Sequence, residues 1–311
     1  MADGSRSVAL EAEAAEAEAA REAKADLLPR AITVESAAKL PEPPPKEAKE
    51  SKSPNKAGGR AAWAEFTVDV WITNLNSVEF GLYKHSRNRA KSRQFTTDMD
   101  IFAEIIENGE RTGVLGYRKE LWNGATGTDK RLVFKLFSET LNWKASMDMM
   151  LGRSIQQTLG ASGLPITAFS INTSDDDFII YLERSGHKWP LLPERFSFFI
   201  MHEGAPKFYH FKRDVINIGG DYTLIDQHGE HVGHLDGAVL TIGGKWRGKL
   251  RGDHADPRIL MVMKLFAGMI VFNGEARRHV RRLAREIYAG RLKPDIQRQE
   301  ADLYLNPRRI R

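Results

Sequence analysis

The feature that most constrains the fold is Ile259–Phe272, a segment in which nearly every side chain is apolar. As a helix, its 14 residues would span about 21 Å at ~1.5 Å per residue, whereas the hydrocarbon core of a bilayer is ~30 Å thick. Lys264 lies near its middle, where a charge is costly in lipid. We therefore expect a buried core helix rather than a transmembrane span, with Lys264 reaching a partner or the edge of the core.

A meander of short strand signals, separated by Gly and Asp, precedes this segment. The signals are Phe208–Phe211, Val215–Ile218, Tyr222–Ile225, His231–Leu235, Ala238–Ile242 and Lys245–Leu250. Strands in such close succession favour antiparallel pairing through short turns. The order of strands and helix predicts a β-rich α+β fold, in which an antiparallel sheet curls around the buried helix.

The remaining chain divides into three parts. Residues 1–60 are predicted to be a disordered tail, Ala/Glu-rich over residues 8–26 and a Pro/Lys-rich linker over residues 41–60. Residues 61–274 form the expected barrel domain, and residues 275–311 an extra basic amphipathic helix and tail. Whether residues 61–165 belong to the barrel or form a domain of their own is left open.

Two patterns organise the first half of the domain. Asn108-Gly109 lies between the strand-like segments Asp100–Glu107 and Gly113–Trp122, which predicts a β-hairpin. Apolar residues then recur at helical spacing over residues 141–159, namely Trp143, Met147, Met150, Leu151, Ile155 and Leu159. We interpret residues 141–159 as a helical insertion in the barrel.

Positive charge is concentrated at the C-terminal end. Residues 245–311 contain 17 basic and 7 acidic side chains, a net charge of +10, whereas the whole chain has a net charge of +5. Such a field attracts acidic lipids, acidic proteins or nucleic acids. No recognised nucleic-acid-binding module is present, which makes that partner the least favoured of the three.

Two rows of cations are the candidate binding residues. Lys245, Arg247, Lys249 and Arg251 alternate along one predicted strand and would share one face. Arg277, Arg281 and Arg285 recur every four residues in the segment Gly274–Gly290, whose opposite face is apolar. That helix could lie on an anionic surface, or it could pack on the domain and leave a solvated basic face.

Catalytic and metal motifs are weak. The chain has no cysteine, which excludes disulfides and thiolate chemistry, and it lacks the G-x-S-x-G elbow of serine hydrolases. His228, His231 and His234 could offer three imidazoles to a zinc ion, but His231 and His234 would point to opposite faces of a strand. We therefore expect no metal site, no cofactor and no enzymatic activity.

The meander resembles a known superfamily. Between Phe211 and Trp246, a pattern of turn and strand residues is similar to that of the LURP-one-related proteins and phospholipid scramblases of the Tubby-like C-terminal superfamily. The matching residues are Tyr222, Leu224, Asp226, Gly229, Val232, Gly233 and Gly237. The resemblance implies a twelve-stranded barrel closed around a hydrophobic C-terminal helix, and some members bind phosphoinositide headgroups through basic side chains. Asp253–Pro257 does not match the calcium-type segment of the scramblases, so scramblase activity is not implied.

These patterns lead to one functional hypothesis and one alternative. We expect a cytoplasmic, peripherally membrane-associated module that binds acidic phospholipid headgroups through the two rows of cations. The alternative is a scaffolding subunit whose tail and basic helix contact acidic proteins.

Overall fold

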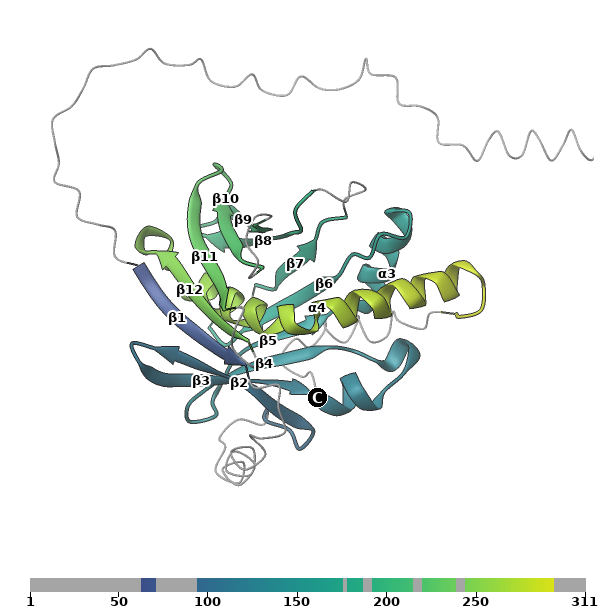
Figure 1. The fold of residues 1–311 in the computed structure, drawn as a ribbon, viewed down its shortest axis with the longest axis horizontal. Helices are drawn as coiled ribbons and strands as arrows, with labels where there is room; N and C mark the ends of the chain where they lie inside the picture. Colours follow the sequence, from purple (N-terminus) through teal and green to yellow (C-terminus); the bar gives the residue numbers. More distant parts are fainter. Residues whose placement is uncertain are drawn as a thin grey trace, which may run out of the picture. The chain divides into compact units, whose positions relative to one another are not determined.

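Twelve strands close into an antiparallel barrel in the computed structural model, which describes residues 63–70, 94–175, 178–186, 192–214, 220–238 and 244–293. Each strand pairs with its neighbours in the chain, and β1 closes the barrel against β12 (Figure 1). The strands are β1 (Trp63–Val70), β2 (Met99–Glu107), β3 (Glu110–Arg118), β4 (Val133–Ser138), β5 (Trp143–Met149), β6 (Ala168–Thr173), β7 (Ile180–Arg184), β8 (Arg195–His202), β9 (Ala205–Arg213), β10 (Tyr222–Asp226), β11 (His231–Ala238) and β12 (Lys245–Arg251). The predicted antiparallel barrel is confirmed, and because β1 to β5 form part of it, residues 61–165 are not a separate domain.

Several predicted regions lie outside the described residues. They are the tail and linker over residues 1–60, the strand Val215–Ile218, most of Ala238–Ile242, and the tail from residue 294 onward. The predicted hairpin at Asn108-Gly109 is present between β2 and β3, and both turn residues have a positive φ, 54° and 82°. A left-handed conformation at two successive positions is what Asn-Gly accommodates at low cost.

The predicted helical insertion at residues 141–159 is wrong. Trp143–Met149 is strand β5, paired with β4 and β6, and helix α3 begins only at Leu151 and ends at Gly160. Met147 and Met149 point into the core with no exposed surface, while Ser146 and Asp148 occupy the other face and are buried as well. Because both faces are covered, the segment lacks the alternation of exposure that marks a half-buried strand, and its apolar spacing imitates a helix.

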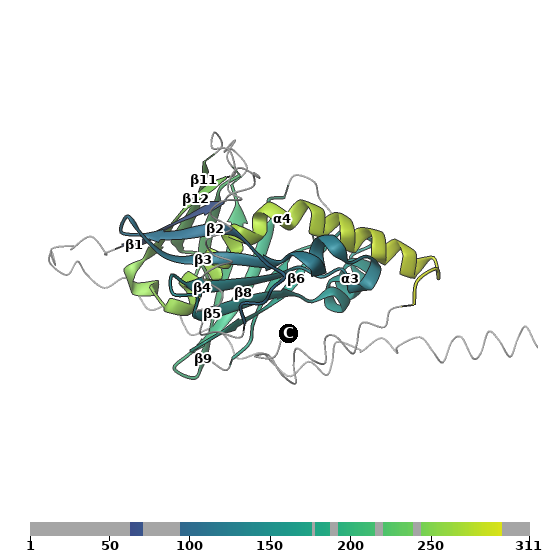
Figure 2. The same cartoon turned by 90° about the horizontal axis from the view of Figure 1, so that it is seen from below.

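A single helix, α4 (Pro257–Tyr288), follows the last strand and fills the barrel. Its start matches the sequence: Pro257 is the first helical residue, and the Asp256 carboxylate accepts a hydrogen bond from the Arg258 backbone N–H at 2.8 Å. The extra basic helix predicted beyond residue 274 is not separate, because the apolar segment and the arginine-rich segment are consecutive halves of α4. Figure 2 shows the second half continuing past the strands beside α3.

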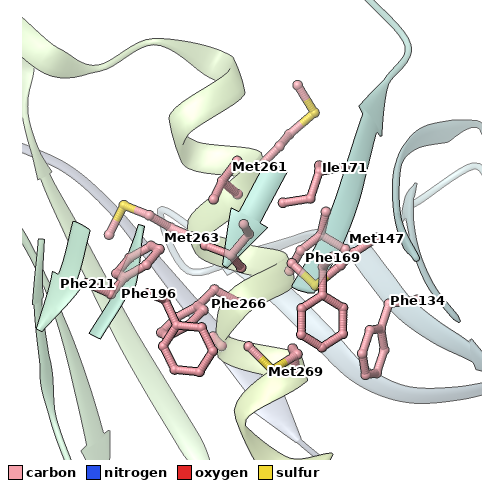
Figure 3. Close-up of a cluster of buried hydrophobic side chains, with 14 of the residues drawn as sticks. Phe134, Met147, Phe169, Ile171, Phe196, Phe211, Met261, Met263, Phe266 and Met269 are labelled. Carbon is pink, nitrogen blue, oxygen red and sulfur yellow. The ribbon is translucent and has the colours of Figure 1, made fainter. Parts of the chain in front are cut away.

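Aromatic and methionine side chains pack the first half of α4 against the strands (Figure 3). Phe266 stacks on Phe211 with ring centroids 4.0 Å apart, and its edge contacts Phe196 and Tyr222. Met263 and Met269 are fully buried beside it. Fully burying a side chain of this size stabilises a fold by roughly 1.5–3 kcal/mol. The apolar face of α4 is therefore the centre of the hydrophobic core.

Lys264 and Glu107 form the ion pair that the sequence analysis required. The Lys264 Nζ donates to Glu107 Oε1 at 2.7 Å, at the end of β2, and lies 5.6 Å from the centre of the Phe66 ring. Burial alone would raise the pKa of Glu107, but hydrogen bonds from Lys264 and Thr112 hold it below its usual value. The charge within the apolar half of α4 is thus neutralised at the barrel wall.

Candidate functional site

The four cations of β12 face outward, as their alternation predicts. Trp246, Gly248 and Leu250 are buried, and the residues between them are partly or fully exposed. The pairing of β12 with β1, however, places acidic residues beside them. The Lys245 Nζ lies 3.5 Å from Asp69 Oδ2, and the Lys249 Nζ lies 2.9 Å from Glu65 Oε1. Local sequence could not reveal these pairs, because the partners are about 180 residues apart in the chain.

The last cation of this row, Arg251, is paired twice. Its guanidinium contacts Glu230 at 2.9 Å and Asp253 at 2.7 Å. Arg247 makes no ion pair within the part of the chain that the structure describes. It lines an open groove of about 600 Å³ with Lys249, but Glu65 and Asp236 line the same groove. Three of the four cations on the outer face of β12 therefore have an acidic partner.

The arginines of α4 have different surroundings. Arg277 is half-buried, and its Nη1 lies 3.5 Å from the buried carboxylate of Glu194. Arg281 and Arg285 are exposed, as are Arg278 and Arg282 between them. The two carboxylates of this half of α4 are occupied elsewhere: Glu275 by Lys130 at 2.8 Å, and Glu286 by Arg291 at 2.7 Å. Arg278, Arg281 and Arg285 consequently make no ion pair with any described residue. We call the four exposed arginines, Arg278, Arg281, Arg282 and Arg285, the arginine end of α4.

Glu194 fixes the direction in which the arginine end points. Its carboxylate accepts hydrogen bonds from Arg184 Nε, from the Tyr222 hydroxyl at 2.9 Å and from Asn273 Nδ2 at 3.2 Å. Burial alone would raise the pKa of Glu194, but Arg184, Tyr222 and Arg277 hold it below its usual value. At the opposite end of the barrel, Arg258 Nη1 donates to the Met201 carbonyl oxygen at 2.7 Å. α4 is thus anchored at its start to β8 and near its middle to Glu194, which precedes β8. No sequence pattern indicated this role of Glu194.

The three histidines of the predicted cluster do not come together in the described residues. His231 is exposed, His234 is half-buried beside the buried Leu235, and His228 lies in the β10–β11 turn. In the described residues, no group of three or more His, Asp or Glu side chains could hold a metal ion.

A second group of charges, which includes Lys135 and Asp148, is buried on the outer face of β4 and β5. Burial lowers the pKa of Lys135 to about 8 and raises the pKa of Asp148 to about 6. The Lys135 Nζ donates to the side chain of Gln94 at 2.8 Å, and Asp148 Oδ1 lies 3.1 Å from Arg131 Nε. Because Lys135 and Asp148 have no exposed surface, they support the wall and offer nothing to a ligand.

Of the described helices, α4 alone has the length and apolar composition of a membrane span. About 61% of its most apolar window is buried, and the core helix of a barrel meets the same criteria. Comparison with known proteins adds no further evidence, since no family model, curated protein or solved structure matches the chain.

Proposed function

We propose that the protein is a non-enzymatic module that binds anionic membrane surfaces through the arginine end of α4. The observation that carries this proposal is that Arg278, Arg281 and Arg285 are exposed and lack a carboxylate partner, while the carboxylates around them are already paired. Unpaired cations held on a rigid helix attract anionic headgroups without first having to break an internal ion pair.

We further propose that the barrel is of the Tubby-like type. The closed antiparallel barrel, the hydrophobic helix within it, and the turn residues Tyr222, Asp226 and Gly229 support this assignment. The proposed lipid-binding residues differ from the initial expectation, because Lys245, Lys249 and Arg251 are neutralised by their neighbours and drop out of the site.

The expected strength of this electrostatic binding is modest. A basic side chain near an anionic membrane contributes ~1 kcal/mol, so the four arginines together supply about 4 kcal/mol. This corresponds to a dissociation constant on the order of 1 mM. Binding through the arginines alone should therefore be weak and should decrease with added salt.

Vesicle sedimentation with two matched triple variants tests the site. Arg278→Gln, Arg281→Gln and Arg285→Gln remove three unpaired charges from α4, whereas Lys245→Gln, Arg247→Gln and Lys249→Gln remove three from β12. On vesicles containing phosphatidylserine, we expect the α4 variant to bind at least tenfold more weakly and the β12 variant to bind within twofold of the wild type.

Three results would overturn the proposal. Equal binding of the wild type to neutral and acidic vesicles at low salt would exclude an electrostatic membrane site. An equal loss of binding in both triple variants would show that net charge, rather than the arginine end, determines association. Tight binding to an acidic protein, with none to vesicles, would favour the scaffolding alternative.

A further inference from the structure

An aromatic row lies on the outer face of the β8–β9 hairpin, exposed at Phe208 and partly buried at Phe199 and Phe178. Phe199 and Phe208 are opposite one another in the register, with ring centroids 5.4 Å apart, and 51% of Phe208 is exposed. The Phe178 ring extends the row, 5.4 Å from Phe199. A contiguous apolar patch of this kind on an outer face is unfavourable in water and marks a contact surface.

Cations continue the same face toward the start of β8. Arg195 lies directly opposite Lys212 in the register, and Ser197 and His210 separate this pair from the phenylalanines. Neither side chain makes an ion pair with a described residue, and neither strand of the hairpin contains Asp or Glu; Glu203 lies in the turn. Two like charges directly opposite each other destabilise a strand pair, so this arrangement favours an anionic partner.

The start of the hairpin lies near the middle of α4. Glu194, the residue before Arg195, contacts both Asn273 and Arg277 of α4. Arg281 and Arg285 follow Arg277 at one-turn intervals and so lie on the same side of the helix. Arg195 and Lys212 therefore lie near the point where the arginine-rich half of α4 begins, and the aromatic row lies farther along the hairpin. β8 and β9 lie side by side along this wall of the barrel in Figure 2.

We infer that the outer face of the β8–β9 hairpin is the apolar half of a bilayer-binding surface. Phe199 and Phe208 enter the boundary between headgroups and acyl chains, while Arg195 and Lys212 contact anionic headgroups. This inference rests on the proposed function and deepens it. It assigns Phe199 and Phe208 a contact with acyl chains, which an acidic protein or a nucleic acid does not have. It also provides the additional affinity that the arginines alone lack.

The packing of the rings favours lipid over single-stranded nucleic acid. A base stacks on the free face of an aromatic ring. Here Phe199 has Phe208 against it on one side, tilted by 36°, and Phe178 edge-on at 61°. Two neighbouring rings therefore already cover part of Phe199, which leaves less of its surface for stacking on a base than for contact with acyl chains.

Single-cysteine labelling measures the insertion directly, because the natural chain has no cysteine. An environment-sensitive NBD fluorophore is attached at Ser197→Cys, an exposed position between the cations and the phenylalanines, which leaves both rings intact. The control label is at Asp236→Cys, exposed on the outer face of β11. With phosphatidylserine vesicles we expect a blue shift at position 197, and at least twofold quenching there by nitroxides on the acyl chains, with neither change at position 236.

A paired variant separates this inference from the proposed function. Phe199→Ser with Phe208→Ser should weaken binding to the acidic vesicles about tenfold and leave binding to heparin, a soluble polyanion, unchanged. Trp63→Ser, which removes an exposed aromatic from β1, should change neither the binding to acidic vesicles nor the binding to heparin.

The inference fails and the proposed function stands if the wild type binds acidic vesicles, the label at position 197 stays in water, and the double serine variant binds as well as the wild type. If the wild type does not bind acidic vesicles, the proposed function itself fails. If an oligonucleotide displaced the protein from the vesicles by binding to Phe199 and Phe208, the partner of this surface would be a nucleic acid. That result would overturn the inference.

Discussion

Gly248 shows how closely single residues of the barrel wall are fitted to the core. It lies opposite Phe66 in the pairing of β12 with β1, and a Cβ built on it would lie only 2.1 Å from Cζ of the Phe66 ring. Phe66 itself is almost completely buried. The absence of a side chain at position 248 is therefore what allows an aromatic residue at the seam where the barrel closes.

Gly248→Ala should destabilise the fold by ~1–3 kcal/mol, the usual cost of overpacking a core. Urea unfolding measures this change. Combined with Phe66→Leu, which frees space at the same point, the alanine should cost less than it does alone. Simple addition of the two single effects would show that the clash with the Phe66 ring is not the cause.

His279 is a buried histidine whose ring contacts identify its neutral tautomer. Arg282 Nη2, which can only donate, lies 3.2 Å from the ring Nδ1, so Nδ1 accepts. The other nitrogen, Nε2, then carries the proton and donates to the Lys130 carbonyl oxygen at 3.2 Å. Burial, and next the charge of Arg282, lower the pKa of His279 to about 4.

This shift predicts a loss of stability in mild acid. The pKa of His279 in the folded protein lies below the ordinary value of 6.5. Between pH 6.5 and 4, His279 therefore binds a proton in the unfolded chain but not in the folded protein. Stability should decrease over that window, by at most ~3 kcal/mol. In urea unfolding at pH 7 and pH 4.5, His279→Gln should show a smaller pH-dependent change than the wild type. An identical change in both proteins would contradict this assignment.

At the scale of elements, α4 combines two kinds of surface that the sequence distinguished well. The apolar run and the Asp256-Pro257 start predicted its core half, and the four-residue spacing of arginines predicted its basic half. The alternation of the late strands was equally informative. The pattern at residues 141–159 was misleading, and the helix expected there was wrong. β5 is covered on both faces, so its pattern does not reveal which side faces the core.

The ion pair between Lys264 and Glu107 gives an asymmetric prediction at this scale. Glu107→Gln leaves the Lys264 charge partly buried without its counterion and should cost ~1–3 kcal/mol. Lys264→Met removes the charge and adds apolar volume to the core, so it should change stability much less. Thermal unfolding of the two variants compares them, and an equal loss in both would indicate that the pair itself, rather than an unpaired charge, determines the cost.

At the scale of the whole molecule, the charge segregation of the sequence located the positive end but did not show which cations have an acidic partner. Both rows of cations are present, and both face outward over most of their length. Only the structure shows that Glu65 and Asp69 neutralise the row on β12, because strand pairing between distant segments is not encoded in local spacing. The same applies to the neighbouring hairpin, where the register brings Phe199 beside Phe208 and Arg195 beside Lys212.

The central claim is that the arginine end of α4 binds anionic membranes. The most direct test is arginine-specific labelling with phenylglyoxal, with and without phosphatidylserine vesicles, in which mass spectrometry measures the labelling of each arginine. Arg278, Arg281, Arg285 and Arg195 should be protected by the vesicles, whereas Arg247, which is also exposed and unpaired among the described residues, should react at the same rate in both samples. Protection of Arg247 with continued labelling of the arginines on α4 would place the membrane against β12 instead of α4 and contradict the account.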